Sequence, residues 1–297
     1  MAAELEFLFA LLVSGLAIGM MYSLIALGFV LVYKATDAIN FAQGEFVMLA
    51  GFICATTLVY KFPLWIAILL TVVLMIGFSF ALERVVLRPL LGRPVVAVIM
   101  ATIGLAAILR GLPPITIGAQ TKTIPLPIGD EPVTFLWTTV PQIQLLGIVV
   151  TVLSIAGFTW FFTKSRMGVA MRAVADNQQV AMAMGINVER YFAIAWAMAG
   201  IVAALGGIIW GSMLGVDTQL ALVGLKVFPV VILGGLDSIA GAIVGGLIVG
   251  LVESVAAGYL DPVVGGGTKD FAPYVLMIVM LMFKPYGLFG KRRIERI

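Results

Sequence analysis

Uncharged apolar runs of membrane-spanning length are the feature that most constrains this chain. Residues 7–33 and 191–216 contain no charged side chain, and residues 62–82 and 145–162 form two further runs. A helix needs about 20 apolar residues to cross a bilayer. The chain is 62% hydrophobic, and a soluble globule of 297 residues has too little interior for that many apolar side chains. We therefore predict an all-α polytopic integral membrane protein, with a single transmembrane domain over residues 1–297.

Shorter apolar segments leave the number of spans open. A longer segment, 238–260, carries Glu253, and the short ones are 46–60, 95–109, 227–236 and 271–283. Irregular backbone is tolerated in a membrane only where protein or a cavity covers it, and broken helices recur in transporters. Two interpretations stand side by side: the short segments are broken or re-entrant, or they extend into flanking polar residues as ordinary helices. In total we expect about eight to ten transmembrane helices, including short or broken ones.

Basic residues predict the orientation in the membrane, because cytoplasmic loops carry an excess of Lys and Arg. Five of them crowd the C-terminal end: Lys284, Lys291, Arg292, Arg293 and Arg296. If that end is cytoplasmic, counting back through nine crossings places the N-terminus outside, in the periplasm. Thirteen of the 18 Lys and Arg residues then lie on the cytoplasmic side. The first apolar run follows two acidic residues and no basic one, so we interpret it as a first span rather than a cleaved signal peptide.

Missing residue types exclude several function classes. The chain has no His and a single Cys, Cys54, which removes His-based acid–base chemistry, His metal sites and intrachain disulfides. The net charge of +3 gives no support for nucleic-acid binding. The sequence contains no G-x-x-x-x-G-K-[ST] loop, so any ATP chemistry must come from a partner. We expect no catalytic residue, no metal ligand and no cofactor.

Two loops stand out from the apolar background. Residues 111–144, predicted to be a periplasmic loop, hold six of the 13 prolines, and alternation at 121–124 and 133–135 indicates short extended pieces. Residues 164–190, predicted to be cytoplasmic, are the most polar stretch of the chain.

The cytoplasmic loop is predicted to contain a short helix over about 177–184. Asp176 is a natural N-cap and Gly185 a natural C-terminal stop. Val180, Ala181 and Met184 would then share one apolar face. Such a helix either docks into a groove on a partner or lies against the underside of its own protein, and spacing alone favours the second.

Three blocks of sequence resemble the branched-chain amino acid permeases of ABC transporters, of the LivH type. The first is GMMYSLIALGFVLVY at 19–33, continued by INFAQGEF at 39–46; the second is RAVADN…A…GIN over 172–187; the third is FPVVILGGLDSIAGAIVGG at 228–246. Since these blocks lie near both ends and the middle, the resemblance covers nearly the whole chain.

The resemblance implies a permease subunit of an ATP-driven importer in the bacterial inner membrane, with a type II-like helical bundle. It implies three kinds of partner besides lipid: a second homologous permease subunit forming a heterodimer, two cytoplasmic ABC ATPases, and a substrate-binding protein outside. It also makes residues 164–190 the segment that couples to the ATPases. The coupling residues would be Arg172, Asp176, Asn177, Ala181 and Gly185.

Candidate pathway residues lie at the starts of two small-residue helices. Asn40, Gln43 and Gly44 precede or open one, and Ser238 and Gly241 open the other. Free N–H groups at a helix start inside the bilayer favour anionic groups such as a carboxylate. Either these residues shape a translocation path, or Asn40 and Gln43 only cap a helix at the cytoplasmic surface.

Lys226 and Glu253 are the ionisable groups most surrounded by apolar sequence. Charges inside a membrane are costly, so they are usually paired or functional. They form a structural ion pair, or each lies near an interface with Lys226 reaching outward.

The leading interpretation is a permease subunit that translocates branched-chain or other neutral amino acids, or a related solute such as urea or a short amide. The alternative is an ATP-independent carrier or channel for small neutral solutes, for which the polar loop at 164–190 has no evident use. An intramembrane enzyme has little support without His, an acid pair or a nucleophile constellation.

Overall fold

The computed structural model describes residues 2–90, 93–118, 120–128, 132–135 and 138–290. Within these residues, six helices are long and apolar enough to cross a membrane. Two further apolar helices are shorter, Gln43–Val59 and Thr218–Gly234. The predicted fold class, a helical polytopic membrane protein with long and short helices, is confirmed. The basic residues at 291–293 and 296 that informed the orientation lie outside the described residues.

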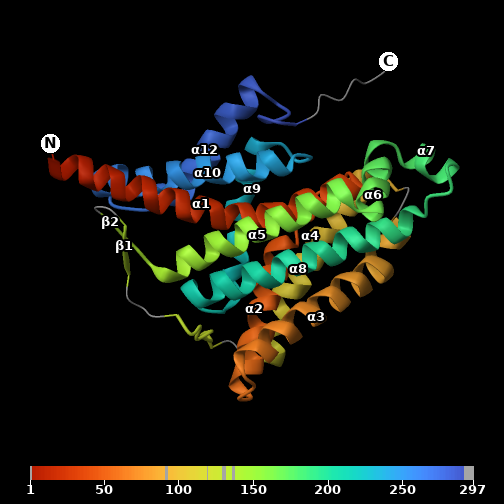
Figure 1. Cartoon of the computed structure of the whole chain (residues 1–297), viewed down its shortest axis with the longest axis horizontal. Coiled ribbons are helices and arrows are strands. Elements are labelled where there is room, and N and C mark those ends of the chain that lie inside the picture. Colours follow the sequence, from red (N-terminus) through yellow and green to blue (C-terminus); the bar gives the residue numbers. More distant parts are fainter. Residues whose placement is uncertain (1, 91–92, 119, 129–131, 136–137, 291–297) are drawn as a thin grey trace. The chain divides into compact units, whose positions relative to one another are not determined.

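Figure 1 shows the helices in chain order. They are α1 (Ala2–Thr36), α2 (Gln43–Val59), α3 (Leu64–Leu82), α4 (Val95–Thr116), α5 (Gln142–Lys164), α6 (Arg166–Asp176), α7 (Gln178–Ala183), α8 (Val188–Leu214), α9 (Leu222–Gly234), α10 (Ile239–Val255), α11 (Asp261–Val264) and α12 (Thr268–Phe283). Shorter helical turns extend some of them: η1 (Glu83–Leu87) and η2 (Arg88–Leu90) after α3, η3 (Thr218–Ala221) before α9, and η4 (Ala256–Leu260) after α10.

Contacts within the chain cluster in two compact units. Unit 1 comprises Met1–Ala26, Pro127–Leu153 and Lys226–Ile297, and unit 2 comprises Leu27–Leu126 and Ser154–Leu225. Each unit therefore draws on segments that are far apart in the sequence.

In unit 2, α8 packs along both α2 and α3. Phe46 of α2 meets Trp196 of α8 with ring centroids 6.1 Å apart, and both side chains are at most 2% exposed. Farther along α8, Gly207 allows the helices to approach closely, because a Cβ atom there would lie 2.9 Å from the Cβ of Ala50. This packing makes α2 and α8 the buried centre of the unit, whereas α3 and α4 expose many apolar side chains.

In unit 1, the first part of α1 packs on α10 through glycines. A Cβ atom on Gly19 would lie 2.5 Å from the carbonyl oxygen of Gly246, so only glycine fits at this crossing. The hydroxyl of Ser23 donates to the Gly19 carbonyl at 2.9 Å and lies 3.3 Å from the Ile243 carbonyl, and α12 packs on the other part of α10. Small residues that bring backbones together are the usual means of helix association in lipid.

The predicted Pro-rich loop is shorter in the structure than 111–144. Helix α4 continues through Pro113 and Pro114 to Thr116, and α5 begins at Gln142. The predicted extended pieces are present: β1 (Val133–Phe135) pairs antiparallel with β2 (Thr138–Val140), and Lys122 pairs with Val216.

The two interpretations of the short segments each hold in part. The segment 95–109 is an ordinary helix that continues past Arg110. By contrast, the segment 46–60 belongs to the short helix α2, which starts only after a largely buried non-helical connection at residues 37–42. The segment 238–260 is part of a nearly continuous helix over Ile239–Val264 that includes Glu253.

Candidate functional site

The polar loop between α5 and α8 folds into two short capped helices, α6 and α7, here called the coupling segment (residues 165–187) (Figure 1). Ser165 caps α6 by accepting a hydrogen bond from Gly168 N–H at 2.8 Å. Asn177 caps α7 by accepting from Val180 N–H at 3.0 Å, and Asn187 caps α8 by accepting from Arg190 N–H at 3.1 Å. The start of each of these three helices is thus fixed by a side chain that accepts a hydrogen bond from a backbone N–H in the first helical turn.

The predicted N-cap of this segment was wrong by one residue. Asp176 is the last residue of α6. Asn177 takes the capping position, because its backbone is extended and its side chain accepts a hydrogen bond from the Val180 N–H. The predicted stop at Gly185 is correct. Its φ is +80°, and the amides of Gly185 and Ile186 donate to the carbonyls of Met182 and Ala181. This is a Schellman arrangement, which favours glycine at that position.

The inner face of the coupling segment anchors it to unit 2. Gly168 lies directly against the backbone of Phe161 and Phe162, and Met171, Val174 and Ala181 are buried. Ala181 was expected to share an apolar face with Val180 and Met184. Ala181 is instead 3% exposed, whereas Val180 and Met184 stay exposed.

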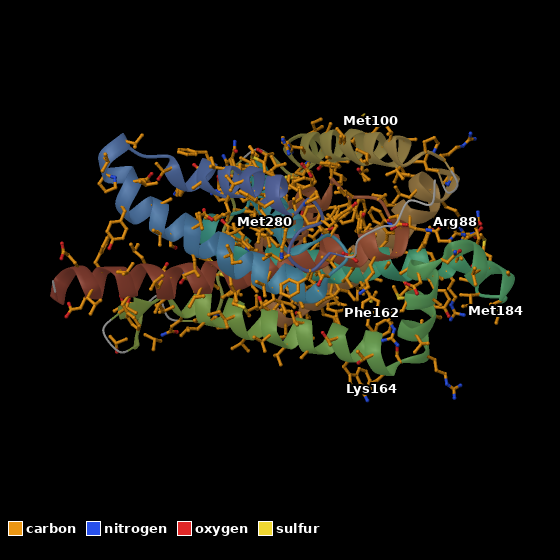
Figure 2. The ribbon with its side chains drawn as sticks, turned by 90° about the horizontal axis from the view of Figure 1, so that it is seen from above. Arg88, Met100, Phe162, Lys164, Met184 and Met280 are labelled. Carbon is orange, nitrogen blue, oxygen red and sulfur yellow. The ribbon has the colours of Figure 1, made fainter. Side chains whose placement is uncertain are left out.

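The outer face of the segment combines charge with exposed apolar side chains. Arg172 and Asp176 are exposed on α6, and Val180 and Met184 are 58% and 77% exposed. Met182, which sequence reasoning did not single out, is 55% exposed. Figure 2 places Met184 at the outer end of the segment. Exposed apolar side chains on a short capped helix and at its C-cap are typical of a docking surface.

The connection before α2 is held by buried amide side chains. Asn40 and Gln43 are completely buried. The Asn40 amide donates to Gln43 Oε1 at 3.2 Å, Asn40 Oδ1 accepts from Ala42 N–H at 3.1 Å, and Gln43 Nε2 lies 3.5 Å from the Ala199 carbonyl. These bonds satisfy backbone that no regular helix covers. The interpretation that Asn40 and Gln43 only cap a helix at the surface does not fit, since neither side chain is exposed and neither caps α2 directly.

The start of α2 is also fixed by a close contact and an ion pair. Gly44 lies against the Ala221 carbonyl oxygen and Gly224, where a Cβ atom would come within 3.0 Å of the Gly224 Cα. Glu45, which is 2% exposed, pairs with Arg110 of α4. The predicted apolar segment ended at residue 109, whereas α4 continues through Arg110, whose charge is paired with Glu45.

Ser238 and Gly241, the other predicted pathway residues, belong to unit 1. Ser238 caps α10 by accepting from Gly241 N–H at 3.0 Å, and Gly241 lies against the Gly234 carbonyl. The structure therefore shows a capping and packing role for both, and their place in a pathway stays a prediction.

Lys226 lies between two carboxylates in unit 1. Its ammonium is 3.2 Å from Glu253 Oε1 and 2.7 Å from Asp270 Oδ1. The Glu253 side chain is 10% exposed and that of Asp270 is 58% exposed. The ion pair between Lys226 and Glu253 is therefore present, and Asp270, which sequence spacing did not reveal, is its third member. Among the described residues, no group of three or more His, Cys, Asp or Glu side chains could hold a metal ion.

A family model described as the permease component of branched-chain amino acid transport systems matches residues 11–283. The chain belongs to this family. The resemblance seen in the three sequence blocks is thereby confirmed over almost the whole length.

Individual members of the branched-chain amino acid permease family match end to end. The high-affinity branched-chain amino acid transport system permease protein BraD of Pseudomonas aeruginosa is 32% identical, with 96% of this chain and 97% of the relative covered. The corresponding LivH protein of Escherichia coli K12 is 28% identical, with 96% of each chain covered. A probable LivH protein of Methanocaldococcus jannaschii is 30% identical over 90% of this chain and 88% of its own length.

A solved structure shares the fold of this family member. A chain of PsaBC from Streptococcus pneumoniae, in complex with a Fab, matches with a TM-score of 0.51, covering 96% of this chain and 97% of the other. The sequences are 13% identical, so the likeness concerns the fold alone.

Proposed function

We propose that this chain is a transmembrane subunit of an ATP-driven ABC importer that moves branched-chain or other neutral amino acids across the bacterial inner membrane. The observation that carries the proposal is the outer face of the coupling segment. Its exposed Val180 and Met182 lie on α7, which is capped at both ends and anchored by Ala181, and the exposed Met184 follows directly as the C-cap residue. Apolar side chains gathered in this way outside the membrane-length helices support a docking role.

Two ATPase subunits are the partners that fit the coupling segment. The chain has no phosphate-binding loop of its own, so the energy of ATP hydrolysis must reach it through a contact surface. Arg172 and Asp176 flank the apolar side chains and would fix the register of docking. A second permease subunit completes the pore, and a substrate-binding protein delivers the solute from outside.

Docking can be tested with the full complex purified through a tag on the ATPase. Met184→Asp places a charge at the most exposed of the three apolar side chains, and we expect it to lower co-purification of the permease at least tenfold. Arg172→Glu should lower it as well, through charge reversal. Tyr60→Asp is the matched control, since Tyr60 is 74% exposed at the turn between α2 and α3. Equal co-purification of Met184→Asp and Tyr60→Asp would overturn the assignment.

The orientation that the proposal requires places the coupling segment and the C-terminus in the cytoplasm and the N-terminus in the periplasm. The excess of basic residues on one side supports it. Cys54 is the single cysteine and is buried, so a Cys54→Ser background allows single reporter cysteines. In intact cells, a membrane-impermeant maleimide should label Tyr60→Cys and spare Met184→Cys. Labelling of Met184→Cys in intact cells would reverse the orientation.

The substrate class rests on the family, whose matched members are named for branched-chain amino acid transport. We infer that the buried turn with Asn40, Gln43 and Gly44, together with Ser238 and Gly241 at the start of α10, borders the route of the solute. Gln43→Leu should then change the KM for uptake, while Thr71→Val, also at a buried polar side chain, should not. Equal kinetics for the two variants would assign Asn40 and Gln43 to structure alone.

A further inference from the structure

Unit 2 contains a cavity of about 360 Å³ beside the coupling segment. Its wall comes from the end of α1, the turns after α3, the start of α4, the start of α7 and the first part of α8. The volume lies at the lower end of the range for small-molecule sites, roughly 300–1,000 Å³. It therefore suits a ligand of a few heavy atoms.

Opposite charges line this cavity. Asp37 and Glu83 supply carboxylates, and Arg93 supplies a guanidinium. Glu83 is 1% exposed, and Arg88 holds both of its oxygens: Arg88 Nη2 lies 3.1 Å from Glu83 Oε2 and Arg88 Nε lies 3.4 Å from Glu83 Oε1. Asp37, which is only partly buried, is therefore the carboxylate of this wall that an ammonium donor could reach.

The remaining wall is apolar, with Leu87, Phe192 and Trp196 among its members. Phe192 and Trp196 are each 2% exposed, so they are rigidly packed. A ligand that satisfies such a wall carries an ammonium group, a carboxylate and a compact apolar side chain. A purely anionic ligand would face the Asp37 carboxylate, and a purely apolar one would leave Asp37 and Arg93 desolvated.

The cavity also touches the coupling segment. Asn177, Gln178 and Gln179 form part of its wall, and Asn177 is the residue that caps α7. A ligand in the cavity would therefore join the base of α7 to α3, α4 and α8. Since the ATPases are proposed to dock on the outer face of α7, such a ligand would resist any movement of α7 relative to these helices.

We propose that this cavity is a regulatory site for a zwitterionic amino acid with an aliphatic side chain, which enters from the cytoplasm and slows ATP-driven import when bound. This regulatory role rests on the proposed function. It differs from a step in translocation, because a bound amino acid lowers the rate of import and reaches the site from the cytoplasm.

Direct binding is tested on the purified permease–ATPase complex without the substrate-binding protein. L-leucine should change tryptophan fluorescence, and Trp196→Phe should remove the change. Isoamylamine lacks the carboxylate, 4-methylpentanoate lacks the ammonium and glycine lacks the side chain. Each should bind at least tenfold more weakly than leucine. Arg93→Ala should weaken leucine binding at least tenfold, whereas Arg84→Ala, an exposed arginine outside the cavity wall, should leave it unchanged.

Regulation is tested in proteoliposomes with ATP inside and the loaded substrate-binding protein outside. Leucine sealed inside should lower the initial rate of uptake and of ATP hydrolysis at least threefold. Arg93→Ala should relieve that inhibition while keeping the uninhibited rate. The same concentration of free leucine added outside should not inhibit.

Three outcomes overturn the proposal. Normal uptake with no inhibition by internal leucine removes the regulatory site and leaves the proposed function intact. A lower rate for Arg93→Ala in vesicles without internal amino acid makes the cavity a step of the pathway instead. Complete absence of ATP-dependent uptake refutes the proposed function and the regulatory role together, even where leucine binds.

Discussion

Replacing Gly44 with alanine tests the packing that fixes the start of α2. The new Cβ atom would lie 3.0 Å from the Gly224 Cα and closer still to the Ala221 carbonyl oxygen. Carbon atoms in ordinary contact are about 3.5–4.0 Å apart, so the start of α2 and the start of α9 must separate by roughly 0.5–1 Å. The displaced residues include Gln43, whose amide bonds hold the buried turn.

The expected change in the free energy of unfolding for Gly44→Ala follows from two opposing contributions. Overpacking of a tight contact costs about 1–3 kcal/mol. Alanine gains about 0.5–1 kcal/mol over glycine inside a helix. The net loss is about 1–2 kcal/mol, which lowers the Tm by roughly 2–3 °C for a chain of this size. Gly104→Ala is the matched control, because a Cβ atom there meets nothing within 4 Å.

Thermal unfolding in detergent, followed at one scan rate by the loss of the monodisperse peak, measures the difference. We expect Gly44→Ala to unfold a few degrees below the parent protein and Gly104→Ala to unfold at or slightly above it. If Gly44→Ala is as stable as Gly104→Ala, the close contact between α2 and α9 is not a determinant of the fold.

Three further changes address other parts of the account. Lys226→Met leaves Glu253 buried without its cation. Since Lys226 is 31% exposed, we expect the free energy of unfolding to fall by about 2 kcal/mol, and adding Glu253→Gln should restore part of it. Equal thermal stability of the single and double variants would count against the pair. Asn177→Ala removes the cap of α7, worth about 1 kcal/mol locally, so amide exchange over residues 178–183 should accelerate while the global Tm stays unchanged. Val180→Asp should weaken ATPase co-purification less than Met184→Asp, because Val180 is 58% and Met184 77% exposed, and the reverse order would relocate the docking centre.

Hydropathy predicted the long helices well because a membrane demands apolar side chains over a fixed length. It left the end of α4 open, since the apolar window stops before Arg110 and the helix continues to Thr116. Arg110 pairs with Glu45, a residue 65 positions away. A pairing at that separation leaves no periodic signal in the sequence.

Local rules predicted α7 to within one residue at each end, whereas the preceding helix α6 was not predicted. Gly185 was correctly placed as the stop, since a left-handed backbone at the end of a helix favours glycine. The N-cap was assigned to Asp176 instead of Asn177 because adjacent Asp and Asn are equally good caps and only the backbone conformation distinguishes them. The direction in which Ala181 points depends on the body beneath it, so spacing alone could not predict it.

The groups with tertiary partners were the least predictable. Asp270 joins Lys226 and Glu253 only after α12 has packed on α10. The cavity beside the coupling segment is built from the ends of five elements, and its lining extends from Thr36 to Trp196. No motif marks either group, because each exists only once distant segments have met.

ATP-dependent uptake in reconstituted vesicles tests the central claim most directly. The measurement compares labelled leucine uptake by vesicles that contain this chain and its partner permease, with and without the ATPases, in the presence of the substrate-binding protein. The account predicts uptake only when ATP and both ATPases are present, and loss of uptake in Met184→Asp. Uptake by this chain alone, at the same rate without ATPases, would show a self-sufficient carrier or channel and would contradict the account.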